Sequence, residues 1–251
     1  MKRIFDIVAS GIGLILLSPL FVILAIWIKC DSTGSVFYRQ IRVGRNNRDF
    51  QLLKFRSMRV GSDKKGLITV GGRDPRITRS GYYIRKYKLD EFPQLINVLK
   101  GDMSLVGPRP EVRKYVDLYT AEQRRVLAVR PGITDYASIV YMDENRLLGQ
   151  SSNPDKTYVE DIMPAKIKLN MRYINHPTLF EYFKLIFLTI FKIARSKKDR
   201  FCFYVKCYRE SWCKNRLSPF FISIERLRLK GDRHLRTDLE GLTQLDKRIP
   251  E

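Results

Sequence analysis

The sequence predicts an α+β protein that attaches to a membrane through its N-terminal segment. Three observations lead to this prediction. Residues 7–28 are apolar and carry no charge, and short strand and helix patterns follow them. The 251 residues include 47 Lys and Arg against 26 Asp and Glu, a net charge of +21. Such an excess of positive charge suits an anionic membrane face, a phosphorylated substrate or nucleic acid.

The apolar segment 7–28 is long enough to cross a bilayer as a helix, at about 1.5 Å per residue. Its length, and the lack of a small-residue cleavage site after it, argue against a cleaved signal peptide. Ser18-Pro19 lies in the middle of the segment. A proline inside a helix costs roughly 3 kcal/mol unless the lost hydrogen bond is relieved.

Basic residues flank both ends of this segment, so the positive-inside rule places both ends in the cytoplasm. They are Lys2, Arg3, Lys29, Arg39, Arg42, Arg45 and Arg48. Together with the break at Ser18 and Pro19, this pattern favours a re-entrant helix-break-helix over residues 1–30. A kinked helix that spans the membrane is the competing interpretation, and it stays open.

Residues 31–198 read as a small, basic, cytosolic catalytic domain. Residues 35–40 and 49–55 have strand patterns, and the turn at 44–48 would join them as a hairpin. Helices are expected over 77–87 and within 111–118. Capping boxes begin at Thr120 and Thr178, each with Gln or Glu three residues later.

The helix that follows Thr178, to about residue 194, carries Phe183, Phe187 and Phe191 among several bases. We interpret it as an interfacial amphipathic helix that lies on the bilayer. An ordinary core helix fits the same pattern. Residues 199–251 form a basic C-terminal extension with three of the four cysteines, for which the sequence suggests no role.

The stretch 86–110 organises the domain around two adjacent carboxylates, Asp90 and Glu91. Pro93 is tolerated in a first helical turn, and apolar residues then follow at helical spacing up to Lys100-Gly101. Asp90 is therefore expected at or next to a helix N-cap, where unpaired N–H groups favour phosphate. Bases surround the pair: Arg73, Arg76, Arg79, Arg85, Lys86, Lys88, Arg109 and Arg113. Because nearby positive charge lowers the pKa of a carboxyl group, this field predicts an ionised carboxylate beside a polyanionic ligand.

Two further arginines are candidate phosphate ligands. Arg109 lies in GDMSLVGPRP, where two glycines and two prolines stiffen the loop and aim the guanidinium. A structural turn with a solvent-facing arginine would produce the same pattern. Arg56, in KFRSM, is either a second phosphate ligand or one residue on a strand face.

The acid pair, Asp90 and Glu91, also has a simpler interpretation, because adjacent acids at a helix start often only complement the helix dipole.

Several other functions find little support in the residues. The sequence lacks a recognition helix, a zinc finger and an RNP-type aromatic pattern, which argues against nucleic acid as a partner. Neither a P-loop nor a GxGxxG precedes a helix. The two histidines, His176 and His234, lie far from any acid or thiol cluster with zinc-ligand spacing. The cysteines do not form a disulfide framework.

In order along the chain, the motifs resemble those of the bacterial sugar transferases, also called polyisoprenyl-phosphate hexose-1-phosphate transferases or monotopic phosphoglycosyl transferases. The resemblance covers roughly residues 1–198. It rests on KRIFDIVAS, the Ser18-Pro19 break, KFRSM, DPRITRSG, LDEFPQLINVLKGDMSLVGPRP and RPGIT.

This resemblance implies transfer of a sugar 1-phosphate from a UDP-sugar to undecaprenyl phosphate, with release of UMP, as the first step of glycan synthesis. The catalytic domain would lie on the cytoplasmic face of the bacterial inner membrane. The first acid of the pair, Asp90, matches the nucleophile that forms a phospho-sugar aspartyl intermediate, and Glu91 accompanies it with Mg²⁺. Arg85 and Arg109 match phosphate-holding positions. A non-catalytic, membrane-anchored basic adaptor that keeps the family's motifs is the alternative function.

One departure from the family pattern concerns specificity. Many members read PGITGWAQ where this chain reads PGITDYAS, at residues 131–138. This region is a candidate for contact with the sugar or the base, so the sequence does not identify the sugar. A second departure places Asn46-Asn47 in a turn that usually contains glycine. Because Asn tolerates left-handed backbone conformations, we expect that turn to form.

Overall fold

The computed structural model describes residues 1–62, 66, 69, 74–141 and 144–194. The chain divides into two compact units, Met1–Ala194 and Arg195–Glu251. The first unit mixes helices and strands, which confirms the predicted α+β composition. The C-terminal extension and Arg73, one of the bases predicted around Asp90, lie outside the described residues.

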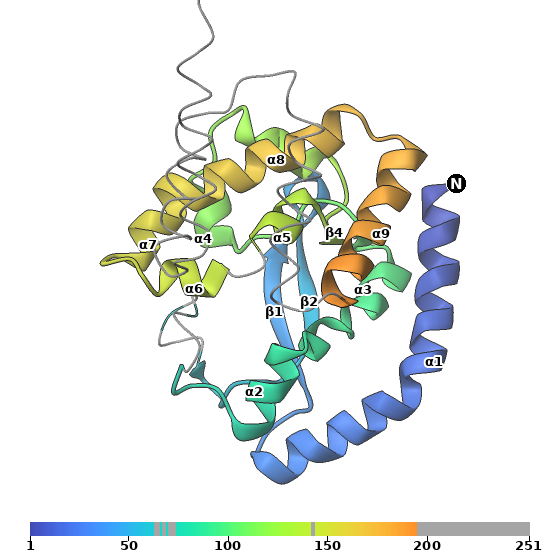
Figure 1. Ribbon diagram of the computed structural model, residues 1–251, viewed down its shortest axis with the longest axis vertical. Coiled ribbons are helices and arrows are strands. Elements are labelled where there is room, and N and C mark those ends of the chain that lie inside the picture. Colours follow the sequence, from blue (N-terminus) through green and yellow to red (C-terminus); the bar gives the residue numbers. More distant parts are fainter. Residues whose placement is uncertain (63–65, 67–68, 70–73, 142–143, 195–251) are drawn as a thin grey trace, which may run out of the picture. The chain divides into compact units, whose positions relative to one another are not determined.

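Helix α1, Lys2–Asp31, is continuous through Pro19. The predicted break is therefore wrong in detail, because the helix bends instead of ending and restarting; Figure 1 shows the change of direction. A proline has no N–H to donate to the preceding turn, and such sites are the usual cause of sharp helix kinks. The Ser18 hydroxyl donates to the carbonyl of Ile15 at 2.7 Å. Among the described residues, α1 is the helix that is long and apolar enough to cross a membrane.

Both ends of α1 are fixed to the same body. Near its start, the buried Asp6 accepts hydrogen bonds from Ser104, from the N–H of Leu105 and from Tyr182. At its end, Asp31 accepts two hydrogen bonds from Ser80, at 2.7 and 2.9 Å. Along its length α1 exposes large apolar side chains. They are Ile4, Phe5, Ile7, Val8, Ile12, Ile15, Leu16, Val22, Ile23, Ile26 and Trp27.

Strands β1, Phe37–Val43, and β2, Asp49–Phe55, pair antiparallel, with Val43 opposite Asp49. The hairpin is therefore confirmed, although β1 runs further than residues 35–40. Asn46 and Asn47 both have positive φ, 55° and 61°, as the sequence predicted for this turn. Strands β3, Ser104–Val106, and β4, Gly132–Thr134, form a second, parallel pair.

Helix α2, Arg79–Lys86, lies within the predicted range 77–87 and is capped by the Thr78 side chain. The 3-10 turn η3, Leu89–Glu91, then precedes helix α3, Gln94–Lys100. The expectation that Asp90 lies at or next to the N-cap of this α-helix is wrong, because Pro93 occupies that position. Gly101, at φ 95°, ends α3 as predicted.

The remaining helices and helical turns of this unit follow in order up to α9. They are α4 (Arg113–Val116), η4 (Gln123–Ala128), α5 (Tyr136–Val140), α6 (Glu144–Leu148), α7 (Pro154–Thr157), η5 (Tyr158–Ile162), α8 (Met163–Asn175) and α9 (Leu179–Ala194). The capping box at Thr120 is confirmed, since Thr120 and Gln123 exchange hydrogen bonds at 2.9 and 3.2 Å. The helix expected within 111–118 is only the single turn α4.

Helix α9 has one buried face and one exposed apolar face, so its interfacial position stays a prediction. It buries Tyr182 and Leu185 completely, as a core helix does. It also exposes a row of aromatic and aliphatic side chains, among them Phe183, Phe187 and Phe191. At its start, Thr178 caps the N–H of Glu181, but the Glu181 carboxylate bonds instead to Tyr136 and Lys184. The second capping box is therefore only half formed.

Candidate active site

Asp90 lies in a turn that its neighbours impose. Lys88 adopts a left-handed conformation with φ 60°, and the chain passes through η3 into α3. The side chain of Asp90 is buried, with the residue only 5% exposed. Its Oδ1 has no hydrogen-bond partner among the described residues. A buried carboxylate oxygen without a partner is costly, so it marks a place where a ligand or a metal ion can be held.

Asn97 joins this segment to the hairpin. Its side chain accepts from the N–H of Leu53 at 2.9 Å and donates to the carbonyl of Gln51 at 2.8 Å. These two bonds fix α3 against β2, the strand that carries Lys54. Asn97 thus sets the acid pair beside a lysine that is distant in the sequence.

Glu91 meets two cations. Both of its oxygens accept from the Arg109 guanidinium, with Nη1 3.1 Å from Oε2 and Nη2 on Oε1. Lys54 Nζ lies 3.7 Å from Oε1 of the same carboxylate. The structure therefore brings the predicted Asp90, Glu91 and Arg109 together and adds Lys54. Lys54 was not among the predicted site residues, although it lies in KFRSM, two residues before Arg56.

The electrostatics of the pair are asymmetric. Burial raises the pKa of Asp90 above its ordinary value, and the charge of Lys54 offsets this only in part. The prediction that surrounding bases lower the pKa of this carboxyl group is therefore wrong in the protein without ligand, because desolvation outweighs them. Burial also acts against ionised Glu91, but Arg109 and Lys54 outweigh it and hold its pKa well below the usual range. Burial lowers the pKa of Lys54 to about 8, although Glu91 opposes the shift.

The loop that carries Arg109 follows β3 and crosses the start of β4 at very close range. A Cβ atom on Gly107 would lie 2.4 Å from the carbonyl oxygen of Arg130, and one on Gly132 would lie 2.1 Å from the amide of Gly107. Both positions therefore need glycine. The N–H of Gly107 donates to the backbone carbonyl of Thr134, and the N–H of Gly132 donates to that of Pro108, each at 3.0 Å.

Asp135 also fixes the loop that carries Arg109. It is 2% exposed and caps α5 through Ser138, and its Oδ2 accepts from the backbone N–H of Arg109 at 2.8 Å. Asn170 on α8 donates to the same oxygen, also at 2.8 Å. Asp135 belongs to PGITDYAS, the departure from the family pattern. Its side chain holds the Arg109 loop, and contact of this region with the sugar or the base stays a prediction.

The other two candidate arginines take different positions. Arg85 is half-buried, donates to Thr69 at 3.1 Å and acts on Asp90 through its charge. Arg56 is buried, and its guanidinium donates to the carbonyls of Ile28, Ser32 and Thr33 at 2.6–3.3 Å. These contacts cap the end of α1. The phosphate role of Arg56 stays a prediction, and we leave it out of the proposed site.

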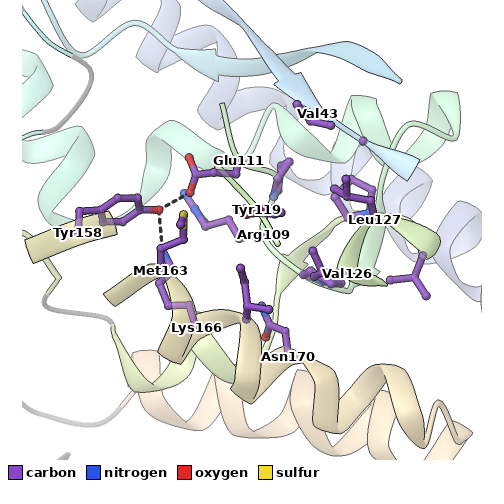
Figure 2. Close-up of a pocket in the computed structure, with 16 residues that line it drawn as sticks. Val43, Arg109, Glu111, Tyr119, Val126, Leu127, Tyr158, Met163, Lys166 and Asn170 are labelled. Atoms are coloured by element: carbon purple, nitrogen blue, oxygen red, sulfur yellow. Dashed lines mark hydrogen bonds between the residues drawn. The ribbon is translucent and has the colours of Figure 1, made fainter. Parts of the chain in front are cut away.

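A cavity lies beside the Arg109 loop (Figure 2). Arg109 itself lines it, together with Glu111, Tyr158 and Lys166, and apolar side chains form much of the rest. Arg109, which also binds Glu91, is the residue that links this cavity to the acid pair.

Comparisons with known proteins identify the family of this chain. Residues 1–196 match the family described as bacterial sugar transferase. A UDP-N-acetylgalactosamine-undecaprenyl-phosphate N-acetylgalactosaminephosphotransferase from Aeromonas hydrophila is 41% identical, over 76% of this chain and 43% of its own. A UDP-glucose:undecaprenyl-phosphate glucose-1-phosphate transferase from Escherichia coli strain K12 is 35% identical, over 76% of this chain and 40% of its own.

The chain thus spans about two-fifths of the length of these two relatives. A third relative is of more similar length: the exopolysaccharide production protein ExoY of Rhizobium meliloti is 32% identical, over 78% of this chain and 86% of its own. The family match covers most of the chain and includes the acid pair, the Arg109 loop and α1. The protein belongs to the bacterial sugar transferase family.

Proposed function

We propose that this protein transfers a sugar 1-phosphate from a UDP-sugar to undecaprenyl phosphate and releases UMP. The observation that carries the proposal is the buried Asp90, whose Oδ1 has no partner among the residues that the structure describes, beside Glu91 held by Arg109 and Lys54. The names of the relatives supply the substrate classes, because they include undecaprenyl phosphate acceptors and UDP-sugar donors. The product would begin a glycan of the exopolysaccharide, capsule or O-antigen type.

The reaction would proceed in two displacements at the phosphorus that bears the sugar. In the first, a carboxylate oxygen of Asp90 forms a bond to that phosphorus, and the bond to the bridging oxygen of the diphosphate breaks to release UMP. In the second, a phosphate oxygen of undecaprenyl phosphate attacks the same phosphorus. The bond to Asp90 then breaks, and the carboxylate is restored. A covalent intermediate splits one difficult transfer into two easier steps.

Arg109 and Lys54 would stabilise the charge on the transferring phosphoryl group. Both are already beside Glu91, so they are oriented before the substrate binds. An arginine fork matches two phosphate oxygens at once, whereas a lysine acts as a compact point charge. Arg85 adds positive charge near Asp90.

The residues present also fit Mg²⁺. This ion is usually held by one or two carboxylates together with substrate phosphates, and the buried Oδ1 of Asp90 has no partner within the described part of the chain. Asp90 and Glu91 would hold the ion, which when bound offsets negative charge on the diphosphate. Neutralising cations around Asp90 would also favour its ionised form, which burial alone disfavours.

Three features support a re-entrant α1 and a catalytic domain on the cytoplasmic face of the inner membrane. The helix exposes apolar side chains along its length, bends near Pro19, and is attached to one body at both Asp6 and Asp31. The exposed aromatic row of α9 supports an interfacial position for that helix as well.

The test is UMP release from a panel of UDP-sugars with undecaprenyl phosphate and Mg²⁺. Wild type should release UMP with at least one donor, whereas Asp90→Asn should lose at least about a thousandfold in rate, because an amide cannot replace the nucleophile. Asp117→Asn, at an exposed carboxylate, is the matched control and should keep wild-type activity. If wild type is inactive with every donor, the adaptor function is the better explanation. If Asp90→Asn matches wild type, Asp90 has no place in the mechanism.

A further inference from the structure

The cavity beside the Arg109 loop is lined by segments that are distant from one another in the sequence. Its lining comes from the end of β1, the Arg109 loop, η4, η5 and α8 (Figure 2). These elements do not include α1 or α9, the helices that carry the exposed apolar side chains described above. The cavity therefore suits a water-soluble group better than the chain of a lipid.

One wall of the cavity is apolar. Val126, Leu127 and Val129 contribute to it from η4 and the residue that follows, with Pro131 and Ile167 beside them. Tyr119 adds an aromatic ring. Such a wall offers flat apolar contact but few hydrogen-bond partners.

The opposite wall is charged and ordered by its own contacts. Glu111 accepts from Arg42 at 3.1 Å, from the N–H of Val112 at 2.9 Å and from Tyr158. Lys166 donates to Glu144 at 2.9 Å and to Tyr158 at 3.5 Å. This wall therefore presents an acceptor, the Glu111 carboxylate, close to a donor, the Lys166 ammonium group.

We propose that this cavity receives the uracil base of the UDP-sugar. This inference rests on the proposed function, because it assigns one part of the donor to one part of the site. Uracil has two flat apolar faces, and its edge alternates one N–H donor with two carbonyl acceptors. A hexose would bring several hydroxyl groups, and the apolar wall would leave some of them without partners, at a cost in binding free energy.

The position of Arg109 fits this assignment. Its guanidinium binds Glu91 beside Asp90, and the residue also lines the cavity. With the base in the cavity, the diphosphate would extend past Arg109 toward the acid pair. The sugar would then lie beyond the reacting phosphorus and outside this cavity. The cavity would therefore recognise the leaving group, UMP, whichever sugar the donor carries.

The test measures UMP binding to the full-length protein, with two variants of the cavity. Leu127→Trp places a large ring in the space, and Lys166→Gln removes the ammonium charge and shortens the side chain. Binding is followed as the rise in melting temperature that UMP causes, with inorganic phosphate as the comparison ligand. Leu118→Trp, at a residue 54% exposed, and Lys168→Gln, at an exposed position on the same helix as Lys166, are the matched controls.

Leu127→Trp should weaken UMP binding at least about tenfold, which corresponds to about 1.4 kcal/mol, and Lys166→Gln should weaken it about threefold or more. The KM for the UDP-sugar should also rise in both cavity variants, whereas their KM for undecaprenyl phosphate should stay at the wild-type value. Both control variants should keep wild-type values throughout. If both cavity variants fold and bind UMP as wild type does, the inference is wrong. A rise confined to the acceptor KM would also overturn it and place the lipid phosphate here.

These outcomes separate the inference from the proposed function. A wild-type protein that binds UMP in the cavity but forms no product would support the inference and count against the proposed reaction. A wild-type protein that forms product, together with cavity variants of unchanged UMP affinity, would support the reaction and overturn the inference.

Discussion

The backbone N–H of Arg109 donates to the Asp135 carboxylate, 26 residues further along the chain, at 2.8 Å. Through this bond the buried acid at the N-cap of α5 fixes the loop that carries Arg109, whose guanidinium binds Glu91. Asn170 on α8 holds the same carboxylate, so three separate segments determine where the Arg109 side chain points.

Asp135→Asn should lower kcat by about tenfold with a smaller effect on the KM for the UDP-sugar. Asparagine can accept on one side only, so either the Arg109 N–H or the Ser138 N–H loses its acceptor, and the other keeps only a neutral one. Hydrogen bonds to charged groups contribute about 1.5–3 kcal/mol. Steady-state kinetics measure the split between kcat and KM, and thermal unfolding measures stability.

Asn153→Ala is the control, since Asn153 caps α7 through the N–H of Lys156 at 3.1 Å but lies at the surface. It should lower stability by about 1 kcal/mol and leave kcat unchanged. If Asp135→Asn lowers the melting temperature without changing kcat, Asp135 supports the fold and does not position Arg109.

The pH profile of kcat/KM should be bell-shaped. Asp90 must lose its proton to act as a nucleophile, so activity should rise with pH through the raised pKa of this group. Lys54 loses its charge as pH rises through about 8, so activity should fall on the alkaline side. Because arginine keeps its charge, Lys54→Arg should move the alkaline limb to higher pH, whereas Lys168→Arg should not. An alkaline limb that stays in place in Lys54→Arg would remove Lys54 from the mechanism.

Arg56→Gln should lower the melting temperature while the KM for the UDP-sugar stays within about twofold of wild type. Its guanidinium donates to carbonyls at the end of α1, and a shorter amide cannot reach all of them. Breaking a buried network of this kind costs about 1–3 kcal/mol. The opposite pattern, a raised donor KM with unchanged stability, would restore the phosphate role that the sequence suggested.

Labelling with a membrane-impermeant maleimide tests the topology of α1. Cys30 is exposed at one end and Ile4 is 67% exposed at the other, so Cys30 and Ile4→Cys serve as probes in a background without other cysteines. A re-entrant helix predicts that both are labelled from the cytoplasmic side alone. Leu16→Cys, near the bend, should resist labelling from either side. Labelling of the two end positions from opposite faces would show that α1 spans the membrane.

Local patterns in the sequence predicted local structure well. The hairpin, the asparagine turn and the Gly101 helix end follow from backbone preferences of a few adjacent residues, and the structure confirms them. The acid pair and Arg109 were found in the same way, from one continuous motif.

Long-range contacts could not be predicted in this way. Lys54 is beside Glu91 because Asn97 joins α3 to β2, a relationship between segments more than 40 residues apart. The predicted direction of the Asp90 pKa shift was wrong for a similar reason. Counting nearby bases in the sequence does not reveal how deeply a carboxyl group is buried. Neither Arg56 at the end of α1 nor Asp135 behind the Arg109 loop has a local signal for its role.

Mass spectrometry of the quenched enzyme tests the covalent mechanism most directly. Wild type mixed with its UDP-sugar and Mg²⁺, without undecaprenyl phosphate, should carry one added sugar phosphate on the peptide that contains Asp90, and Asp90→Asn should carry none. Adding the lipid acceptor should remove the adduct and form product. Product formation by an enzyme that never shows the adduct, or an adduct that persists in Asp90→Asn, would contradict the mechanism.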